Sequence, residues 1–124
     1  MNLNYTSSDL DYRISILKRT VTKDDKSNIV ETFREYKKVW AYVEVRSAAN
    51  VNVEELQHGV VRYFIVIRWD KELFSNIDAL AMDGRFLRLI SPPYKGGLNK
   101  FIVLNARELD LDEPIPNMEF ASLP

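Results

Sequence analysis

The chain lacks cysteine altogether, has one histidine, and contains no apolar segment long enough to cross a bilayer. The absence of cysteine excludes disulfide frameworks, thiol nucleophiles and thiolate zinc sites, and it fits a reducing compartment. A bilayer-spanning helix requires about 20 consecutive apolar residues, and residues 1–5 show neither the basic segment nor the apolar core of a signal peptide. We therefore expect a soluble, cytoplasmic protein with no membrane partner.

Side chains that catalyse reactions or bind metals are also scarce. His58 lies in a polar segment that supplies neither a nucleophile nor an orienting partner. The adjacent carboxylates Asp24-Asp25 and Glu54-Glu55 lie in turn-like segments, and a metal site needs more converging oxygens than such a pair provides. Gly96-Gly97 lacks the strand-to-helix context of a phosphate loop, so we expect residues 94–97 to form a turn. The sequence predicts no enzyme, no cofactor and no metal site.

The size and composition are those of one globular domain, with 124 residues, 46% hydrophobic and 28% charged. The net charge of −1 hides an uneven distribution. Residues 109–124 contain four acidic residues and no basic residue, whereas residues 1–108 contain 17 basic and 14 acidic ones. We expect a single domain over residues 1–108 and an acidic, flexible C-terminal tail over residues 109–124. The mixed charge of the domain differs from the concentrated basic surface of a nucleic-acid reader.

Alternation of side-chain types is what the chain does have, and it is clearest in residues 38–46. A row of small apolar side chains alternates there with larger or charged ones, the period of a strand with one buried face. The first row is Val39, Ala41, Val43 and Val45, which we expect in the core. From the other row we expect Trp40 in the core as well, and we leave open whether Tyr42 is a core residue or part of a subunit contact.

The remaining strands are read from the same alternation and from turn signals. Residues 11–20 and 29–33 lead into residues 38–46 as a long hairpin whose tip lies at 23–28, closed by Asn28 in a left-handed conformation. Residues 60–69 carry apolar side chains on both rows, which indicates a central strand or a face covered by a partner. Residues 77–82 and 86–90 flank Asp83-Gly84, the strongest hairpin signal, and a two-residue turn there places Leu80 opposite Leu87. Residues 100–107 form the last strand.

Two connections interrupt these strands. Residues 70–76 are expected to form a turn or a short helix. Residues 47–59 are longer than a hairpin loop of about 2–5 residues, and Asn52 to Glu55 has a capping spacing that fits one turn of helix. The predicted fold is therefore mainly β: a small antiparallel β-barrel of five or six strands, with one long projecting loop and a flexible C-terminal tail.

The sequence resembles the phage head–tail joining, or head-closure, family of long-tailed bacteriophages and prophages. The similarity covers residues 9–108 and falls in every expected strand, in order. It is carried by Leu10-Asp11-Tyr12-Arg13-Ile14-Ser15-Ile16, the 25–28 turn, Val30-Glu31-Thr32-Phe33, Val39-Trp40-Ala41-Tyr42-Val43-Glu44, Ile65-Val66-Ile67-Arg68-Trp69, and Asp83-Gly84-Arg85 with Leu87 and Leu89. The family has no catalytic residues to transfer.

The resemblance implies a structural virion protein that assembles in the host cytoplasm and resides at the head–tail connector. Copies would form a ring, typically of twelve, beneath the portal and its adaptor, while the isolated subunit is compatible with a monomer. The ring would retain packaged DNA without sequence preference and would dock the tail through tail-completion proteins. Candidate assembly residues lie in the long loop and the tail: Asn50, Val51, Val53, Glu54, Leu56, His58, Ile115, Met118 and Phe120.

Two alternatives remain open from the sequence. A tail-completion or neck protein would share the same logic of a small barrel assembled into a ring. A single-stranded nucleic-acid-binding barrel, from another functional class, would stack bases on a basic aromatic face. Such a face is expected to combine Arg62, Arg68, Arg85 and Arg88 with Phe64, Trp69 and Phe86.

Overall fold

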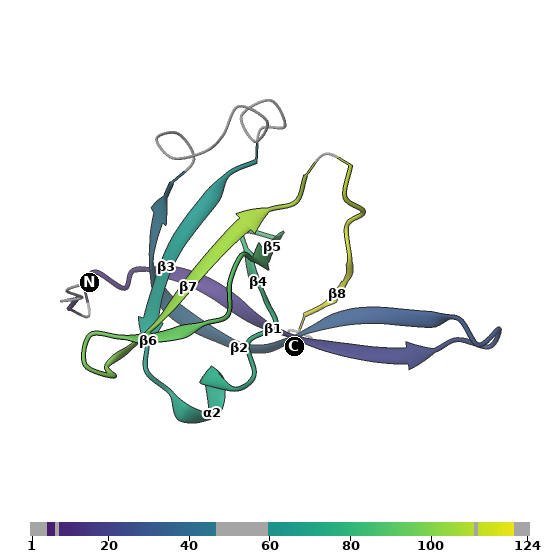
Figure 1. Cartoon of the computed structure of the whole chain (residues 1–124), viewed down its shortest axis with the longest axis horizontal. Helices are drawn as coiled ribbons and strands as arrows, with labels where there is room; N and C mark the ends of the chain where they lie inside the picture. The colour runs from purple at the N-terminus through teal and green to yellow at the C-terminus, as the bar shows by residue number, and fades with distance from the viewer. Residues whose placement is uncertain (1–4, 7, 47–59, 111, 121–124) are drawn as a thin grey trace.

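One sheet that curls back on itself makes up the body of the molecule in the computed structural model (Figure 1). The structure describes residues 5–6, 8–46, 60–110 and 112–120. Its elements are β1 (Tyr12–Lys23), β2 (Ile29–Val45), β3 (Arg62–Arg68), α2 (Lys71–Phe74), β4 (Ala79–Met82), β5 (Arg85–Leu89), β6 (Tyr94–Gly96), β7 (Phe101–Glu108) and β8 (Asn117–Glu119).

The sheet closes through six of these strands. The hydrogen-bonded order β1-β4-β5-β7-β3-β2 is completed by pairing of β2 with β1, all antiparallel, while β6 adds to β7 and β8 adds parallel to β2. This confirms the predicted mainly β fold. The closure is irregular rather than that of a uniform barrel, because β1 meets β4 only at residues 15–17 but pairs with β2 along its whole length. No helix among the described residues is long and apolar enough to cross a membrane.

The interior is filled by the apolar row that each strand turns inward. Its fully buried members are Ile14, Ile16, Ala41, Ile65, Ile67, Leu80, Leu87, Ile102 and Leu104. Of the expected valine and alanine row, Ala41 is buried, Val39 and Val43 are partly buried against this core, and Val45 is 59% exposed. The expectation for Trp40 is wrong: its side chain lies on the outer face of β2 and is 53% exposed.

Apolar side chains also occupy the outer face of the sheet, in two clusters. The first cluster consists of Phe64, Val66, Phe101 and Val103 on β3 and β7, with Tyr5 and Tyr42 packed against it. The second consists of Leu17, Phe33, Ala79, Ala81 and Phe86, with Leu109 and Met118 packed against it. The two apolar rows of β3 are thereby explained, because β3 is central and its outer face is covered by the chain's own N-terminal segment. Tyr42 belongs to this outer cluster.

A long hairpin arm, residues 20–32, extends away from the closed body (Figure 1). In the arm, β1 and β2 pair with each other from Thr20↔Thr32 to Lys23↔Ile29. At its tip, Oδ1 of Asp24 accepts backbone N–H bonds from Lys26 and Asn28, at 2.9 and 2.8 Å. The left-handed residue is Ser27, with φ 64°, and not Asn28 as expected. Asn28 instead closes the turn through its carbonyl oxygen, which accepts from the Asp24 N–H at 2.9 Å.

The connections follow local chemistry. Asp83 and Gly84 both have positive φ, 54° and 77°, and place Leu80 opposite Leu87, as predicted. Residues 70–76 contain the short helix α2, whose first turn is capped by Asp70. Residues 94–96 form strand β6 rather than the expected turn, because the left-handed residues lie later, at 97–99. Residues 47–59, including the capping segment at Asn52, lie outside the described residues.

The Asp83-Gly84 turn yields a prediction about stability. A Cβ added at Gly84 meets no atom within 4 Å, so Gly84→Ala introduces backbone strain alone and should lower the free energy of unfolding by about 1–2 kcal/mol. Leu98→Gly is the matched opposite change, because Leu98 also has a positive φ, 58°, and is 92% exposed. This substitution should leave the free energy of unfolding unchanged or raise it. Urea denaturation measures both, and an unchanged midpoint for Gly84→Ala would contradict the left-handed turn.

Candidate assembly surfaces

The structure describes three of the nine predicted assembly residues. Asn50, Val51, Val53, Glu54, Leu56 and His58 lie outside the described residues. Met118 points inward and packs against the second outer cluster. Ile115 and Phe120 remain outside, with 77% and 45% of their surfaces exposed. The tail therefore divides into one side chain that packs on the body and two that remain substantially exposed to solvent.

The described part of the tail, residues 112–120, forms a strap across the body (Figure 1). It ends in β8, which pairs parallel with β2 at Thr32↔Asn117, Phe33↔Met118 and Arg34↔Glu119. The Arg34–Glu119 ion pair spans 2.9 Å, but both side chains are about 60% exposed, so it contributes little to stability. The stronger attachment on this side is the burial of Met118. The tail's flexibility in solution stays a prediction.

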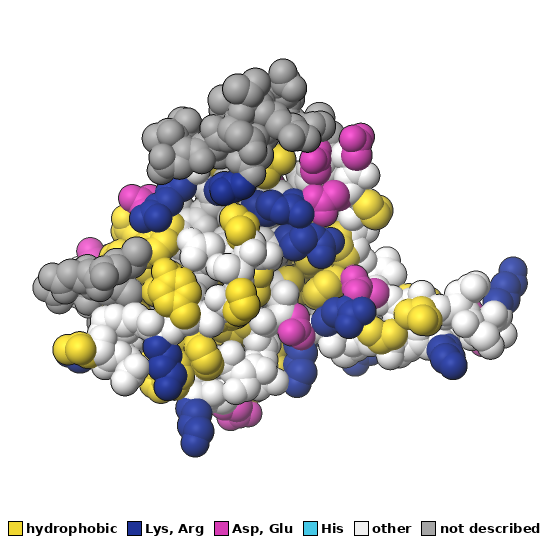
Figure 2. Space-filling view, in the orientation of Figure 1, with side chains coloured by type: hydrophobic (Ala, Val, Ile, Leu, Met, Phe, Trp, Pro, Cys, Tyr) yellow, Lys and Arg dark blue, Asp and Glu magenta, His cyan; other side chains and the backbone are white. Residues whose placement is uncertain are grey.

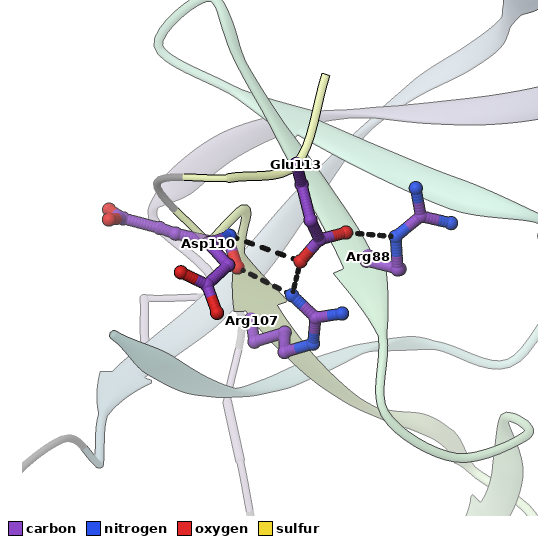
Figure 3. Close-up of polar contacts among 5 residues, drawn as sticks. Arg88, Arg107, Asp110 and Glu113 are labelled. Atoms are coloured by element: carbon purple, nitrogen blue, oxygen red, sulfur yellow. Dashed lines mark hydrogen bonds and ion pairs between the residues drawn. The ribbon is translucent and has the colours of Figure 1, made fainter. Parts of the chain in front are cut away.

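Glu113 fixes the start of the strap to two arginines (Figure 3). Arg107 and Arg88 are directly opposite each other on β7 and β5, a like-charge pair that destabilises a sheet when nothing compensates it. Glu113 compensates both, because Oε1 accepts from Arg107 at 2.6 Å and Oε2 accepts from Arg88 at 3.2 Å. Oε1 also accepts the backbone N–H of Asp110 at 3.1 Å. The hydrogen bonds from Arg107 and Asp110 lower the pKa of Glu113.

The strap should therefore loosen in acid. Because the pKa of Glu113 is lowered in the folded chain, its stabilisation is complete above the ordinary value of 4.5 and is lost as the pH falls through the lowered value. We expect the NMR signal of the Met118 methyl group to shift below pH 4.5. Glu113→Gln should show the shifted signal already at neutral pH, without that acid step.

The matched control for this titration is Glu119→Gln, which removes the exposed carboxylate at the other end of the strap. It should leave the Met118 titration almost unchanged. Identical acid titrations of the Met118 methyl signal in the unmodified protein and in Glu113→Gln would contradict the assigned role of Glu113.

A second surface surrounds the exposed Trp40. A hollow of about 330 Å³ lies between β1, β2 and the segment that leads into α2. We call it the Trp40 groove, and it is lined by Arg13, Lys37, Lys38, Val39, Trp40, Arg68, Trp69, Asp70 and Leu73. The four cationic side chains are all exposed, and Asp70 is the one carboxylate among the lining residues.

Charges in the groove are arranged around its two indoles. The guanidinium of Arg13 lies 4.9 Å from the centre of the Trp40 ring, and the Lys95 ammonium lies 4.7 Å from that of Trp69. Asp70 is engaged twice, as the cap that accepts the Leu73 N–H and as the partner of Lys37 at 3.2 Å. Both contacts lower the pKa of Asp70. The groove thus combines an excess of positive charge with a half-exposed indole.

Sequence reasoning missed this groove because it assigned Trp40 to the core. One signal for it is present in the hairpin register, which places Trp40 directly opposite Arg13. An arginine at the start of β1 is exposed, and its cross-strand partner shares the same face of the sheet. The alternation predicted for residues 38–46 is correct. The row that contains Ala41 faces the core, so Trp40, which belongs to the other row, faces out.

The basic aromatic face expected for nucleic-acid binding does not form a stacking platform. Phe64 and Phe86 are only 3% and 4% exposed, because they belong to the two outer clusters. Arg85 and Arg88 contact Glu108 and Glu113, at 3.1 and 3.2 Å. These aromatic rings are therefore not available to bases.

The Tyr63 hydroxyl makes a partly buried contact between β3 and β7. Tyr63 donates to Glu108 at 2.7 Å, and its burial, together with that hydrogen bond, raises the pKa of Tyr63 to about 12. Within the described residues, no group of three or more His, Cys, Asp or Glu side chains is placed to hold a metal ion.

Comparisons with known proteins give one family match and two similar folds. A family model described as phage head completion protein matches residues 5–109. The solution structure of protein SF1141 from Shigella flexneri 2a has a TM-score of 0.60 and 23% identity, covering 88% of this chain and 100% of that one. A chain from the virion of a native gene transfer agent particle has a TM-score of 0.58 and 16% identity, covering 80% and 94%. These two likenesses show the fold. No curated protein matches.

Proposed function

The chain belongs to the phage head completion family, a family of structural virion proteins, and we propose that it acts as a head-closure protein of the head–tail connector. In this proposal, copies form a ring, typically of twelve, beneath the portal and its adaptor. The ring retains the packaged DNA and presents a docking surface to tail-completion proteins. Subunits are made in the host cytoplasm and assemble there into the virion.

The observation within this chain that supports assembly is the hairpin arm. An isolated two-stranded ribbon is marginally stable in water, yet the arm extends from the body with Val21 48% and Ile29 72% exposed. Figure 2 shows hydrophobic side chains on the visible face of the arm, between charged ones. Docking against a neighbouring subunit would cover these side chains. A closed ring needs two different contact surfaces on each subunit, and a projecting arm supplies one of them.

Two further segments belong to the proposal. Residues 47–59, with Asn50, Val51, Val53, Glu54, Leu56 and His58, are proposed to contact a neighbour or the DNA channel. The tail, with Ile115, Met118 and Phe120, is proposed to order further on a partner. Hydrogen exchange measured on the free and on the assembled protein tests both proposals. Equal protection of these segments in the two states would contradict them.

The central experiment is to mix the protein with portal and adaptor rings and to image the product. A further stacked ring beneath the adaptor is the expected result. A product without that ring would overturn the head-closure assignment, and a ring found only on isolated tail tubes would favour the tail-completion or neck alternative.

Polar replacement of the arm should separate assembly from folding. Val21→Ser combined with Ile29→Ser alters two exposed side chains, so the unfolding midpoint should change little, while incorporation into the connector should fall at least several-fold. Leu98→Ser is the matched control, because Leu98 is 92% exposed in a turn of the body. Equal incorporation of the two variants would exclude the arm as a ring contact.

A further inference from the structure

The Trp40 groove is the strongest unassigned surface of the described molecule. Its floor and walls are rigid, since Trp40 lies on β2 and Trp69 packs against Phe74 of α2 at a ring-centre distance of 5.0 Å. We propose that the groove binds the outward face of the strap of a neighbouring copy of this chain, an acidic segment with exposed apolar side chains. This inference rests on the proposed ring and names one of its subunit contacts.

The exposed indole favours a protein segment over nucleic acid as the occupant. Duplex DNA offers phosphates to the cations, but its bases are stacked inside and give a protruding indole nothing to contact. Stacking on bases would require a single strand. A peptide segment that carries both carboxylates and apolar side chains uses both properties of the groove. Tryptophan and arginine are also the residue types most enriched among the side chains that dominate protein–protein affinity.

Charge complementarity points to the tail of another copy. Residues 109–124 contain four acidic side chains and no basic one. Glu113 and Glu119 are used within the same chain, by Arg88 with Arg107 and by Arg34. Asp112 and Ile115 remain on the outward face. A neighbour's groove is lined by four cations, of which Lys37 pairs with Asp70 and Lys38 with Glu35, and its charge is complementary to that of the strap.

The same chain already shows that the rim of the groove accepts such a segment. Phe120 lines a second hollow, of about 380 Å³, together with Arg13, Ile14, Ser15, Lys38, Ala81, Asp83 and Gly84. Arg13 and Lys38 line both hollows, so the end of the strap and the Trp40 groove are contiguous. A strap from a neighbouring copy would therefore pack beside the Phe120 of the chain that contributes the groove. Groove and strap are different patches, as the head-to-tail contact of a closed ring requires.

Charge reversal in the assembled connector tests the contact. Arg13→Glu and Asp112→Lys should each reduce the number of copies per connector about tenfold or more at limiting protein, and the two changes together should restore it. Trp40→Ala should cause a loss of similar size, the magnitude expected for a central tryptophan. Lys100→Glu, the same reversal in the turn before β7, should assemble normally.

Cross-linking locates the contact directly, because the chain contains no cysteine of its own. Lys37→Cys in the groove and Ile115→Cys on the strap are combined in one chain, assembled on portal and adaptor rings, and treated with a short bismaleimide. A ladder of covalent oligomers is expected, since each groove meets the strap of the next copy. The pair Lys100→Cys and Ile115→Cys should give monomers only.

The outcomes separate this inference from the proposed function. A connector that forms normally with Trp40→Ala and Arg13→Glu, and without the ladder, overturns the groove–strap contact and leaves head closure intact. Groove variants that keep full copy number but release packaged DNA also overturn it, because the groove then faces DNA. Failure of the unmodified protein to form a ring overturns the proposed function itself.

Discussion

Apolar side chains on both faces of a small closed sheet must be kept from water, and the rest of the molecule is arranged to do so. The inner row packs on itself, as in any barrel. The outer face would expose Phe64 and Phe101 on one side and Phe33 and Phe86 on the other. Tyr5 covers the first pair, with ring-centre distances of 4.8 Å to Tyr42 and 5.7 Å to Phe101. Met118 covers the second cluster. Tyr5 and Met118 are therefore part of the packed structure, although neither belongs to the six strands of the closed sheet.

Ion pairs attach the start of the strap to the body. Arg88 and Arg107 face each other across β5 and β7, and a carboxylate between them removes a repulsion in addition to forming two ion pairs. Removing Glu113 would leave two partly buried cations side by side. The strap is thus anchored by charge at its start and by a thioether side chain near its end, with Pro114 and Pro116 between them. Proline fixes φ without needing a backbone donor, which suits an extended connection.

Much of this fold was readable from the sequence where local chemistry decides it. The Asp83-Gly84 turn and the pairing of Leu80 with Leu87 follow from two residues that tolerate positive φ. The long hairpin and the helical connection after Asp70 were read in the same way. The sequence-based predictions were wrong where contacts between distant segments determine the structure. Trp40 is exposed because its row faces out beside Arg13, and Tyr94 joins a strand because its edge of β7 is open. The groove required side chains from β1, β2 and the α2 connection, which no local pattern brings together.

Tyr5 and Met118 pack on the two outer clusters, and several other apolar side chains are still exposed to water. Val21 and Ile29 lie on the arm, Trp40 lies in a basic groove, and Ile115 lies on an acidic strap. These residues are separated in sequence and differ in their surroundings, so one self-complementary patch does not account for them. A subunit with two-fold symmetric contacts uses a single patch twice, whereas a ring joins unlike patches. In the proposed contact, opposite charge on groove and strap would give each patch a preferred partner and would disfavour the pairing of like with like. The exposed apolar side chains thus lie on separate patches that differ in charge, an arrangement that fits the proposed head-to-tail assembly of identical subunits.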